Sequence, residues 1–304
     1  MKCINLYKSH FEPVALRGRS KFTKDSYIHL FRTWKKYSGG YEMRVEDCAN
    51  GRMLEFLEWA QQGRKNTTIN FLARLINCWS KYLVEEGHIE RRDHIRMLPE
   101  THLVPEAYTV EEIQRILRKA RKCLNIWYPK TVKPIPYALW MTCAIRTIWD
   151  TGERINALKT MPWDCVDLAT GVIEIPAIVR KQTRPLKAKL KPRTLTEMRI
   201  LYCYHTEWRR GNPTWNPDRH VFYIQRNRGS IAGDLGEIIK SCKIKVRTGE
   251  RWNRFRRSYA SYLEAAGFSA TVAMMHKNRS TTERYLDPRI VTHESPNEHL
   301  PDLK

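Results

Sequence analysis

Residues 150–168 read DTGERINALKTMPWDCVDL, and this stretch decides how the second half of the chain is interpreted. Residues 135–149 before it, IPYALWMTCAIRTIW, are apolar enough for a buried helix. Thr151 and Gly152 then predict a turn, and Arg154 follows that turn. An arginine at such a place, taken alone, is most often a solvated surface charge. Its meaning therefore depends on the segments that follow.

Those segments predict a small sheet among helices. Residues 171–179, GVIEIPAIV, have strand character, and the basic residues 181–190, KQTRPLKAKL, predict a turn and a second strand of a hairpin. Further helices are expected over 194–210 and 253–267, with a short strand at 220–224. The predicted class is mainly α with a small antiparallel β-sheet.

The first part of the chain predicts an all-helical domain over residues 21–98. Apolar residues recur at helical spacing from Thr23 to Tyr37, from Gly51 to Gln61, and again after the KNTT stretch at 65–68. A capping box of Thr109 with Glu112 then opens the second domain.

The second domain is α+β and is expected over residues 109–287. Three segments are expected to lie outside the two domains: an irregular basic stretch at 1–20, a linker at 99–108, and a C-terminal tail at 288–304 that contains three prolines.

The charge of the chain favours a polyanionic partner. Lys and Arg total 54 against 32 Asp and Glu, which gives a formal charge of +22 and a pI near 9.8. Nucleic acid is the leading candidate. A membrane surface is the rival, but no apolar run reaches the roughly 18 residues of a spanning helix. The opening residues also lack the apolar stretch of a signal peptide, so a cytoplasmic, nucleoid-associated protein is expected.

The eight cysteines do not indicate a metal site. They are scattered, and none forms a C-x-x-C pair or stands at zinc-ligand spacing from a histidine pair. Reduced, mostly buried thiols are expected, with no metal and no cofactor.

Residues 276–288, HKNRSTTERYLDP, place His276 nine positions before Tyr285. Ser280 and Glu283 have the spacing of a capping box, which predicts a short helix with Tyr285 in its first turns and an end at Pro288. A tyrosine near a C-terminus, considered alone, most often packs a last helix against the core.

Together with Arg154, four residues make a set suited to phosphoryl transfer: Lys181, Arg256, His276 and Tyr285. Guanidinium groups bind nonbridging oxygens and neutralise the charge of a pentacoordinate phosphorane. A lysine can protonate a leaving alkoxide, and a tyrosine can act as a covalent nucleophile.

Over about residues 20–286 the chain resembles the tyrosine recombinases, or phage-type integrases. DTGERINALKTMPWDCVDL is similar to the first family box, and RWNRFRRSYASYL (251–263) is similar to the His-x-Leu-Arg-His/Arg box. MMHKNRSTTERYL (274–286) is similar to the box that ends in the family tyrosine. The helical first domain, with KNTTIN at 65–70, is similar to the family's core-binding (SAM-like) domain.

The resemblance implies a role for each matching residue. Arg154 and Arg256 match the two catalytic arginines, Lys181 the hairpin lysine, and His276 and Tyr285 the histidine and the nucleophile. Lys187 is the alternative to Lys181 as the catalytic lysine. DNA contacts are expected from a further set: Arg180, Arg184, Lys187, Arg257, Lys65, Asn66 and Thr67.

Three positions depart from the family pattern. Asn253 stands where the second box has histidine, and an amide cannot take up a proton. Ala157 stands three residues after Arg154, where the family has Glu or Asp. Met275 replaces the glycine before the box histidine, which is interpreted as a packing change.

The resemblance implies a site-specific recombinase or integrase of a mobile element. It would cut DNA through a 3′-phosphotyrosine link with a free 5′-hydroxyl and rejoin it without metal or ATP. The expected partners are double-stranded DNA with core sites, a homotetramer on that DNA, and an accessory DNA-bending or directionality protein.

Two alternatives stay open. One is a DNA-binding regulator that kept the fold and lost catalysis, which Asn253 favours. The other is a type IB topoisomerase or hairpin telomere resolvase, against which the small helical first domain argues. A covalent protein–DNA adduct at one defined sequence would separate these possibilities from a recombinase.

Overall fold

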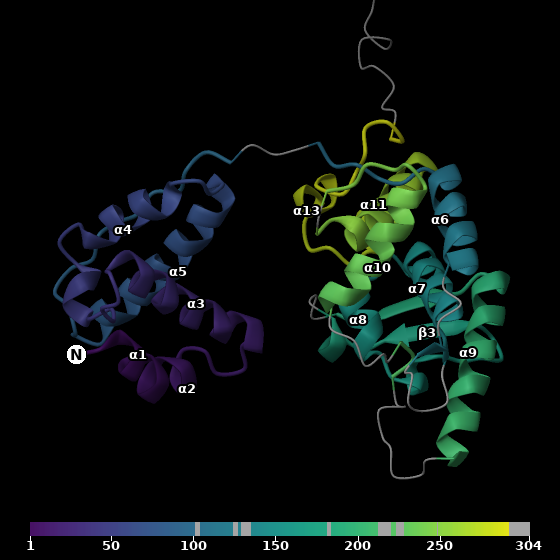
Figure 1. The fold of residues 1–304 in the computed structure, drawn as a ribbon, viewed down its shortest axis with the longest axis horizontal. Helices are drawn as coiled ribbons and strands as arrows, with labels where there is room; N and C mark the ends of the chain where they lie inside the picture. The colour runs from purple at the N-terminus through teal and green to yellow at the C-terminus, as the bar shows by residue number, and fades with distance from the viewer. Residues whose placement is uncertain are drawn as a thin grey trace, which may run out of the picture. The chain divides into compact units, whose positions relative to one another are not determined.

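The computed structural model describes residues 1–100, 104–123, 127–128, 135–180, 184–211, 220–222, 228–247 and 249–291 (Figure 1). The chain divides into two compact units, Met1–His102 and Leu103–Lys304, and the division falls inside the linker predicted at 99–108. Helices dominate both units, and the strands form two small antiparallel pairs. The predicted class, mainly α with a small antiparallel sheet, is confirmed.

Unit 1 is built on three longer helices: α3 (Lys21–Tyr37), α4 (Arg52–Gln61) and α5 (Asn66–Glu85), drawn in purple to blue in Figure 1. A 3₁₀ turn, η2 (Val45–Cys48), precedes α4. Ser20 caps α3, since its hydroxyl accepts a hydrogen bond from the Thr23 amide. Aromatic rings fill the space between the helices, with Trp34 against Phe56 at a centroid distance of 5.4 Å.

The expectation that residues 1–20 are irregular is wrong for most of that stretch. The chain forms α1 (Cys3–Leu6), a π-helical turn η1 (Tyr7–Phe11) and α2 (Glu12–Val14). Cys3, Tyr7 and Phe11 recur every four residues, so they share one helical face and are buried in the core of unit 1. Basic residues between them made the helical spacing of these apolar residues hard to recognise in the sequence.

Asparagines of α5 hold the chain that leaves unit 1. Asn70, almost fully buried, receives a hydrogen bond from the Leu98 amide at 2.7 Å and donates to the Leu98 carbonyl at 2.9 Å. Asn77 does the same for the amide and carbonyl of Ile95. Asn66 donates to the carbonyl of Pro99 at 2.9 Å. The extended segment therefore follows α5 as a strap.

Unit 2 surrounds a central apolar helix, α7 (Tyr137–Thr151). Its main contacts are with α6 (Val110–Cys123), α9 (Pro192–Gly211), α11 (Arg251–Ala265) and β4 (Leu186–Lys189) (Figure 1). Helix α10 (Arg228–Ser241) packs against α6 and α11. Trp140, Ile145 and Ile148 of α7 are buried, as the apolar sequence predicts.

The predicted start of α6 is confirmed. The Thr109 hydroxyl accepts a hydrogen bond from the Glu112 amide, and the Glu112 carboxylate accepts one from the Thr109 amide. Tyr108 and Ala107 are already buried in unit 2, and the Tyr108 amide donates to the Ser258 hydroxyl at 2.8 Å. Packing of unit 2 therefore begins before residue 109.

The predicted hairpin is also confirmed. Strand β3 (Val172–Ile175) pairs antiparallel with β4, with Val172 opposite Lys189 and Ile175 opposite Leu186. Residues 181–183, where the turn is predicted, lie outside the described residues. A 3₁₀ turn, η4 (Ala177–Val179), follows β3. The second pair, β1 (Trp127–Tyr128) with β2 (Ile135–Pro136), was not predicted.

The short strand expected at 220–224 is reduced to one bridge. His220 pairs with Pro162, next to the 3₁₀ turn η3 (Trp163–Cys165). Residues 221–222 form a buried turn, and 223–224 lie outside the described residues. The remaining short helices are α8 (Ile155–Thr160), α12 (Ala270–Ala273) and α13 (Arg279–Glu283).

Of the predicted tail, the structure describes residues 288–291 only. In the described parts of the chain, no helix is both long enough and apolar enough to cross a bilayer.

The strap yields a prediction for stability. Asn70→Ala leaves the amide and carbonyl of Leu98 without their side-chain partner, which should lower the free energy of unfolding by about 1–3 kcal/mol. Urea unfolding followed by circular dichroism measures the difference. Lys81→Ala, on the exposed face of the same helix, is the control and should change it by no more than about 0.5 kcal/mol. An Asn70→Ala protein as stable as the control would contradict the strap.

Candidate active site

Four of the residues singled out in the sequence meet in unit 2. Arg154 Nη2 donates to Tyr285 Oη at 3.3 Å, although the two residues are 131 positions apart. The guanidinium carbon of Arg256 lies 5.3 Å from the centre of the Tyr285 ring. The ring centroids of His276 and Tyr285 are 5.4 Å apart. Two cations and an imidazole therefore surround one phenol.

A glycine turn sets the place of Arg154. Gly152 ends α7 in the left-handed conformation, with a φ of 64°, and a Cβ atom there would clash with the ring of Tyr259. Glycine alone suits both demands. Arg154 then precedes α8, and its backbone amide donates to Glu153 Oε1 at 2.8 Å. The turn is thus fixed by its backbone conformation and by a side chain.

Arg256 reaches the site from α11 and is only 1% exposed. Its Nη1 donates to the carbonyl of Gly152, and its Nη2 donates to His276 Nε2 at 3.0 Å. Burial, and next the charge of Arg154, lower the pKa of Arg256 to about 10. The guanidinium therefore stays charged at neutral pH.

The neighbours of His276 determine its tautomer. Arginine can only donate, so Nε2 accepts from Arg256 and the ring proton sits on Nδ1. Nδ1 then donates to Thr282 Oγ1, which lies at 2.9 Å. Burial, followed by the charges of Arg256 and Arg154, lowers the pKa of His276 to about 4. The imidazole is neutral at pH 7.

The backbone around Met275 orients His276. The His276 amide bonds to the carbonyl of Thr271 and the Met275 amide to that of Val272, which is the pattern of a Schellman motif at the end of α12. Met275 has a φ of 56°, in the left-handed region that glycine usually occupies. The interpretation of Met275 as a packing change is therefore incomplete, because the residue holds a backbone conformation that glycine usually takes.

Tyr285 lies just after α13, in contrast to the predicted helix. The helix begins after Asn278 and ends at Glu283, and the Ser280–Glu283 capping box is not formed. The Tyr285 amide bonds to the Thr282 carbonyl in a turn. Ser280 is the second residue of the helix, whereas a capping hydroxyl belongs to the residue just before it, here Asn278. The Ser280 pattern therefore predicted the wrong helix start.

Two side chains dock the segment that carries Tyr285. The Ser261 hydroxyl donates to the Tyr285 carbonyl at 3.3 Å and accepts from the Asp287 amide at 2.8 Å. The buried Asp287 carboxylate accepts from the Ala107 amide at 2.6 Å and pairs with Arg289. The phenol is thereby held beside Arg154.

The electrostatics of the site favour ionisation of Tyr285. Burial on its own would raise the pKa of the phenol, but the charges of Arg256 and Arg154 and their hydrogen bonds outweigh it. The pKa of Tyr285 is therefore lowered below its ordinary value of 10. A phenol activated in this way suits nucleophilic attack, and the same cations suit a phosphate.

Glu153 is the site residue that the sequence analysis missed. It is fully buried, and its Oε2 accepts from Arg180 Nε at 2.5 Å. Arg180, expected to contact DNA, is also buried, and it donates to the carbonyl of Arg184 at 2.6 Å. An acid in a polar turn predicts exposure, so no local signal marked Glu153 as buried.

The remaining candidates for catalysis lie around this cluster. Lys181 lies outside the described residues. Lys187 pairs with Glu174 on the exposed edge of the hairpin. Asn253 is exposed on α11, one turn before Arg256.

The candidates for DNA contact differ in their exposure and in whether another group of the protein already pairs with them. Arg184 is exposed, whereas Arg257 is partly buried and pairs with Glu250 at 3.1 Å. At the start of α5, Lys65 and Thr67 are exposed, and the amide of Asn66 is engaged by the strap.

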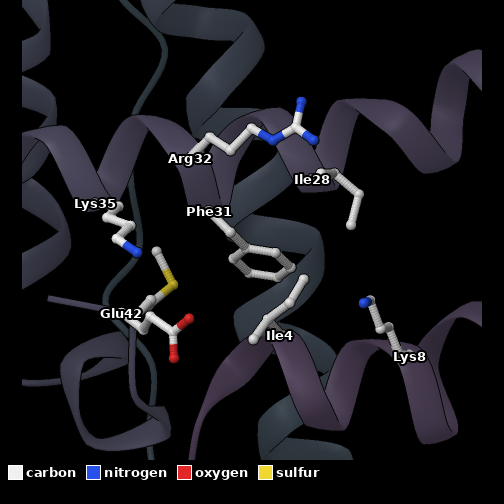
Figure 2. A pocket seen from close by; sticks show the side chains of 8 residues that line it. Ile4, Lys8, Ile28, Phe31, Arg32, Lys35 and Glu42 are labelled. Atoms are coloured by element: carbon white, nitrogen blue, oxygen red, sulfur yellow. The ribbon is translucent and has the colours of Figure 1, made fainter. Parts of the chain in front are cut away.

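A cavity of about 290 Å³ in unit 1 has a different character (Figure 2). Ile4, Ile28 and Phe31 line its apolar part, and cationic side chains including Lys8 and Arg32 border it. No hydroxyl or thiol nucleophile lines it. Among the residues that the structure describes, no group of three His, Cys, Asp or Glu side chains is placed to hold a metal ion.

A comparison with protein-family profiles shows the family of the chain. The sequence profile of the phage integrase family matches residues 107–290, which is more than half of the chain. No curated protein matches the chain.

Solved structures are similar over nearly the whole chain. A fragment of lambda integrase, as a dimer bound to a COC′ core site, has 16% sequence identity and a TM-score of 0.65, with 97% of this chain and 99% of that chain covered. The Tn1549 transposon integrase in complex with transposon right-end DNA has 15% identity and a TM-score of 0.67, with 98% and 96% covered. A lambda integrase tetramer bound to a Holliday junction has 15% identity and a TM-score of 0.65, with 97% and 79% covered.

Proposed function

The chain belongs to the phage integrase family, and we propose that it is an active site-specific recombinase whose nucleophile is Tyr285. The observation that carries the proposal is the contact of Arg154 Nη2 with Tyr285 Oη, 3.3 Å long, under the charge of Arg256. A hydroxyl that only packed a last helix would not need two guanidinium groups around it, one of them, Arg256, buried.

The reaction would proceed through a covalent protein–DNA intermediate. The Tyr285 oxygen attacks the phosphorus of a phosphodiester, the bond to the 5′ oxygen breaks, and a 3′-phosphotyrosine remains. The leaving 5′ oxygen takes a proton, for which Lys181 is the proposed donor. A 5′-hydroxyl of another strand then attacks the phosphotyrosine and releases Tyr285. The phosphotyrosine conserves the energy of the phosphodiester bond, so rejoining needs no ATP.

Arg154 and Arg256 would hold the phosphate. Among the described residues, the buried Arg256 Nε has no hydrogen-bond partner, and this donor would be available to a phosphate oxygen. The two guanidinium groups would neutralise the charge of the pentacoordinate transition state. Their charge is already in place before DNA binds, so little reorganisation is required.

Attack by Tyr285 requires that its hydroxyl proton be removed. His276 has a pKa of about 4 and is a weak base at neutral pH. Asn253 cannot accept a proton. We infer that the arginines favour the phenolate directly and that water takes the proton. Such an enzyme would be slow at neutral pH and faster at higher pH.

Double-stranded DNA with defined core sites is the proposed substrate. Exposed basic residues such as Lys65, Arg184 and Lys187 would contact phosphates, so binding should weaken steeply with salt. The similar lambda integrase forms a tetramer on a Holliday junction, which supports four copies of this chain acting together. The similarity of both units to integrases favours this reading over a topoisomerase.

A regulator that binds DNA without cutting it is the second candidate, because Asn253 replaces the box histidine. The lowered pKa of Tyr285 favours catalysis instead, since a regulator has no use for an activated phenol.

The first prediction for this function removes the nucleophile. Tyr285→Phe deletes one oxygen and keeps the ring, so DNA binding should persist while the covalent adduct is lost. Denaturing gel electrophoresis of labelled DNA detects the adduct. Tyr259→Phe is the matched control, because this partly buried tyrosine of the same unit has a raised pKa, and it should still form the adduct. Cleavage by the Tyr285→Phe protein would end the assignment.

The second prediction concerns Asn253. The single-turnover cleavage rate of the natural chain should rise with pH and level off below pH 10, because the pKa of Tyr285 is lowered. An exposed histidine at position 253 would keep a pKa of about 6.5 and could accept the proton. Asn253→His should therefore cleave about tenfold faster near pH 7, whereas Asn253→Ala should not. A flat natural profile with no gain in the histidine variant would show that this account of the proton is wrong.

A further inference from the structure

Glu153 occupies the centre of the cationic cluster. Its Oε1 accepts from the Arg154 amide at 2.8 Å and lies 3.6 Å from Arg256 Nη1. Its Oε2 accepts from Arg180 Nε at 2.5 Å. The carboxylate is fully buried. One acid thus touches three segments: the turn after α7, helix α11, and the residues that follow β3.

A buried carboxylate of this kind has to be paired, because an ion in a dry interior is strongly disfavoured without a partner. The two buried arginines need Glu153 in the same way. Arg180 and Arg256 are 5% and 1% exposed, and Glu153 is the only acid paired with either of them among the described residues. The placement of both guanidinium groups therefore depends on this side chain.

Position 157, where alanine stands, lies on the same cavity as this acid. The first sequence box resembles one that has Glu or Asp at position 157, and alanine cannot pair with an arginine. Glu153 and Ala157 are four residues apart and line one cavity of about 440 Å³.

We propose that Glu153 is a positioning residue that holds Arg256 and Arg180 for phosphate binding, in place of the acid absent at position 157. The inference rests on the proposed recombinase function for its catalytic meaning. The role of Glu153 in holding Arg256 does not depend on that function, because the orientation of Arg256 can be followed in the protein without DNA.

The geometry shows how Glu153 acts on the site. The carboxylate and the Gly152 carbonyl engage Nη1 of Arg256, and His276 engages Nη2. These three contacts fix the plane of the guanidinium beside the Tyr285 ring. If Glu153 loses its charge, Arg256 loses its ion-pair partner and turns away. His276 Nε2 then loses its donor, and its tautomer is no longer fixed.

Three variants of the full chain test the proposal. Glu153→Gln removes the charge and keeps the shape. Ala157→Glu is added to Glu153→Gln to return an acid to the other position. Glu197→Gln is the matched control, because Glu197 is also a buried carboxylate paired with arginines, at 2.8 Å from Arg121 and 3.3 Å from Arg146, away from Tyr285.

The first readout is single-turnover cleavage of a duplex that carries the core site, together with the affinity for that duplex. Glu153→Gln should cleave about 10–100-fold more slowly, as expected for a misplaced catalytic group, with its affinity nearly unchanged. Adding Ala157→Glu should restore part of the rate. Glu197→Gln should lower the melting temperature and leave the rate as it is. A natural rate in Glu153→Gln would overturn the proposal.

The second readout is the ¹⁵N NMR signal of His276 in the free protein. The natural chain and Glu197→Gln should show an unprotonated Nε2 and a protonated Nδ1, and Glu153→Gln should show a mixture of tautomers. If the natural chain forms no adduct with DNA, the proposed function fails, and this signal alone decides the role of Glu153. An unchanged signal in Glu153→Gln, with a slow rate that Ala157→Glu does not restore, marks a general structural loss and also overturns the proposal.

Discussion

The site depends on an imbalance of buried charge. Two buried guanidinium groups, from Arg180 and Arg256, share one carboxylate, Glu153, and the charge of Arg154 acts on Arg256 as well. Surplus positive charge in a partly dry pocket is unfavourable unless an anion joins it. The phenolate of Tyr285 is one such anion and a DNA phosphate is another. The same positive charge lowers the pKa of Tyr285 and, after burial, that of His276, and it would favour a bound phosphodiester.

Backbone geometry holds this unfavourable arrangement in place. Gly152 turns the chain so that its carbonyl reaches Arg256, and the left-handed Met275 aims His276 at the same guanidinium. A non-glycine residue in that conformation costs about 1–2 kcal/mol, which the surrounding packing must offset. Ser261 and Asp287 then fix the segment after α13. The strained backbone at Met275 and the hydrogen bonds of Ser261 and Asp287 thus lie next to the residues proposed for catalysis.

Much of the fold follows from local patterns in the sequence. The apolar run of α7, the capping box of Thr109 and the alternation in β3 each determine an element through neighbouring residues alone. Residue types and their order also indicated Arg154, Arg256, His276 and Tyr285. Contacts between distant segments could not be predicted in that way.

Three particulars show the limit. Glu153 and Arg180 lie 27 residues apart and bury one another, which no charge pattern reveals. Asn66 resembled a DNA contact, but a backbone carbonyl takes its amide. The ionisation of Tyr285 depends on all of these placements at once. The most direct test is an ultraviolet difference titration of the natural chain against Tyr285→Phe, which isolates this one phenol. We expect it to ionise below pH 10, and an ionisation at or above pH 10 would contradict the claim that the arginines activate Tyr285.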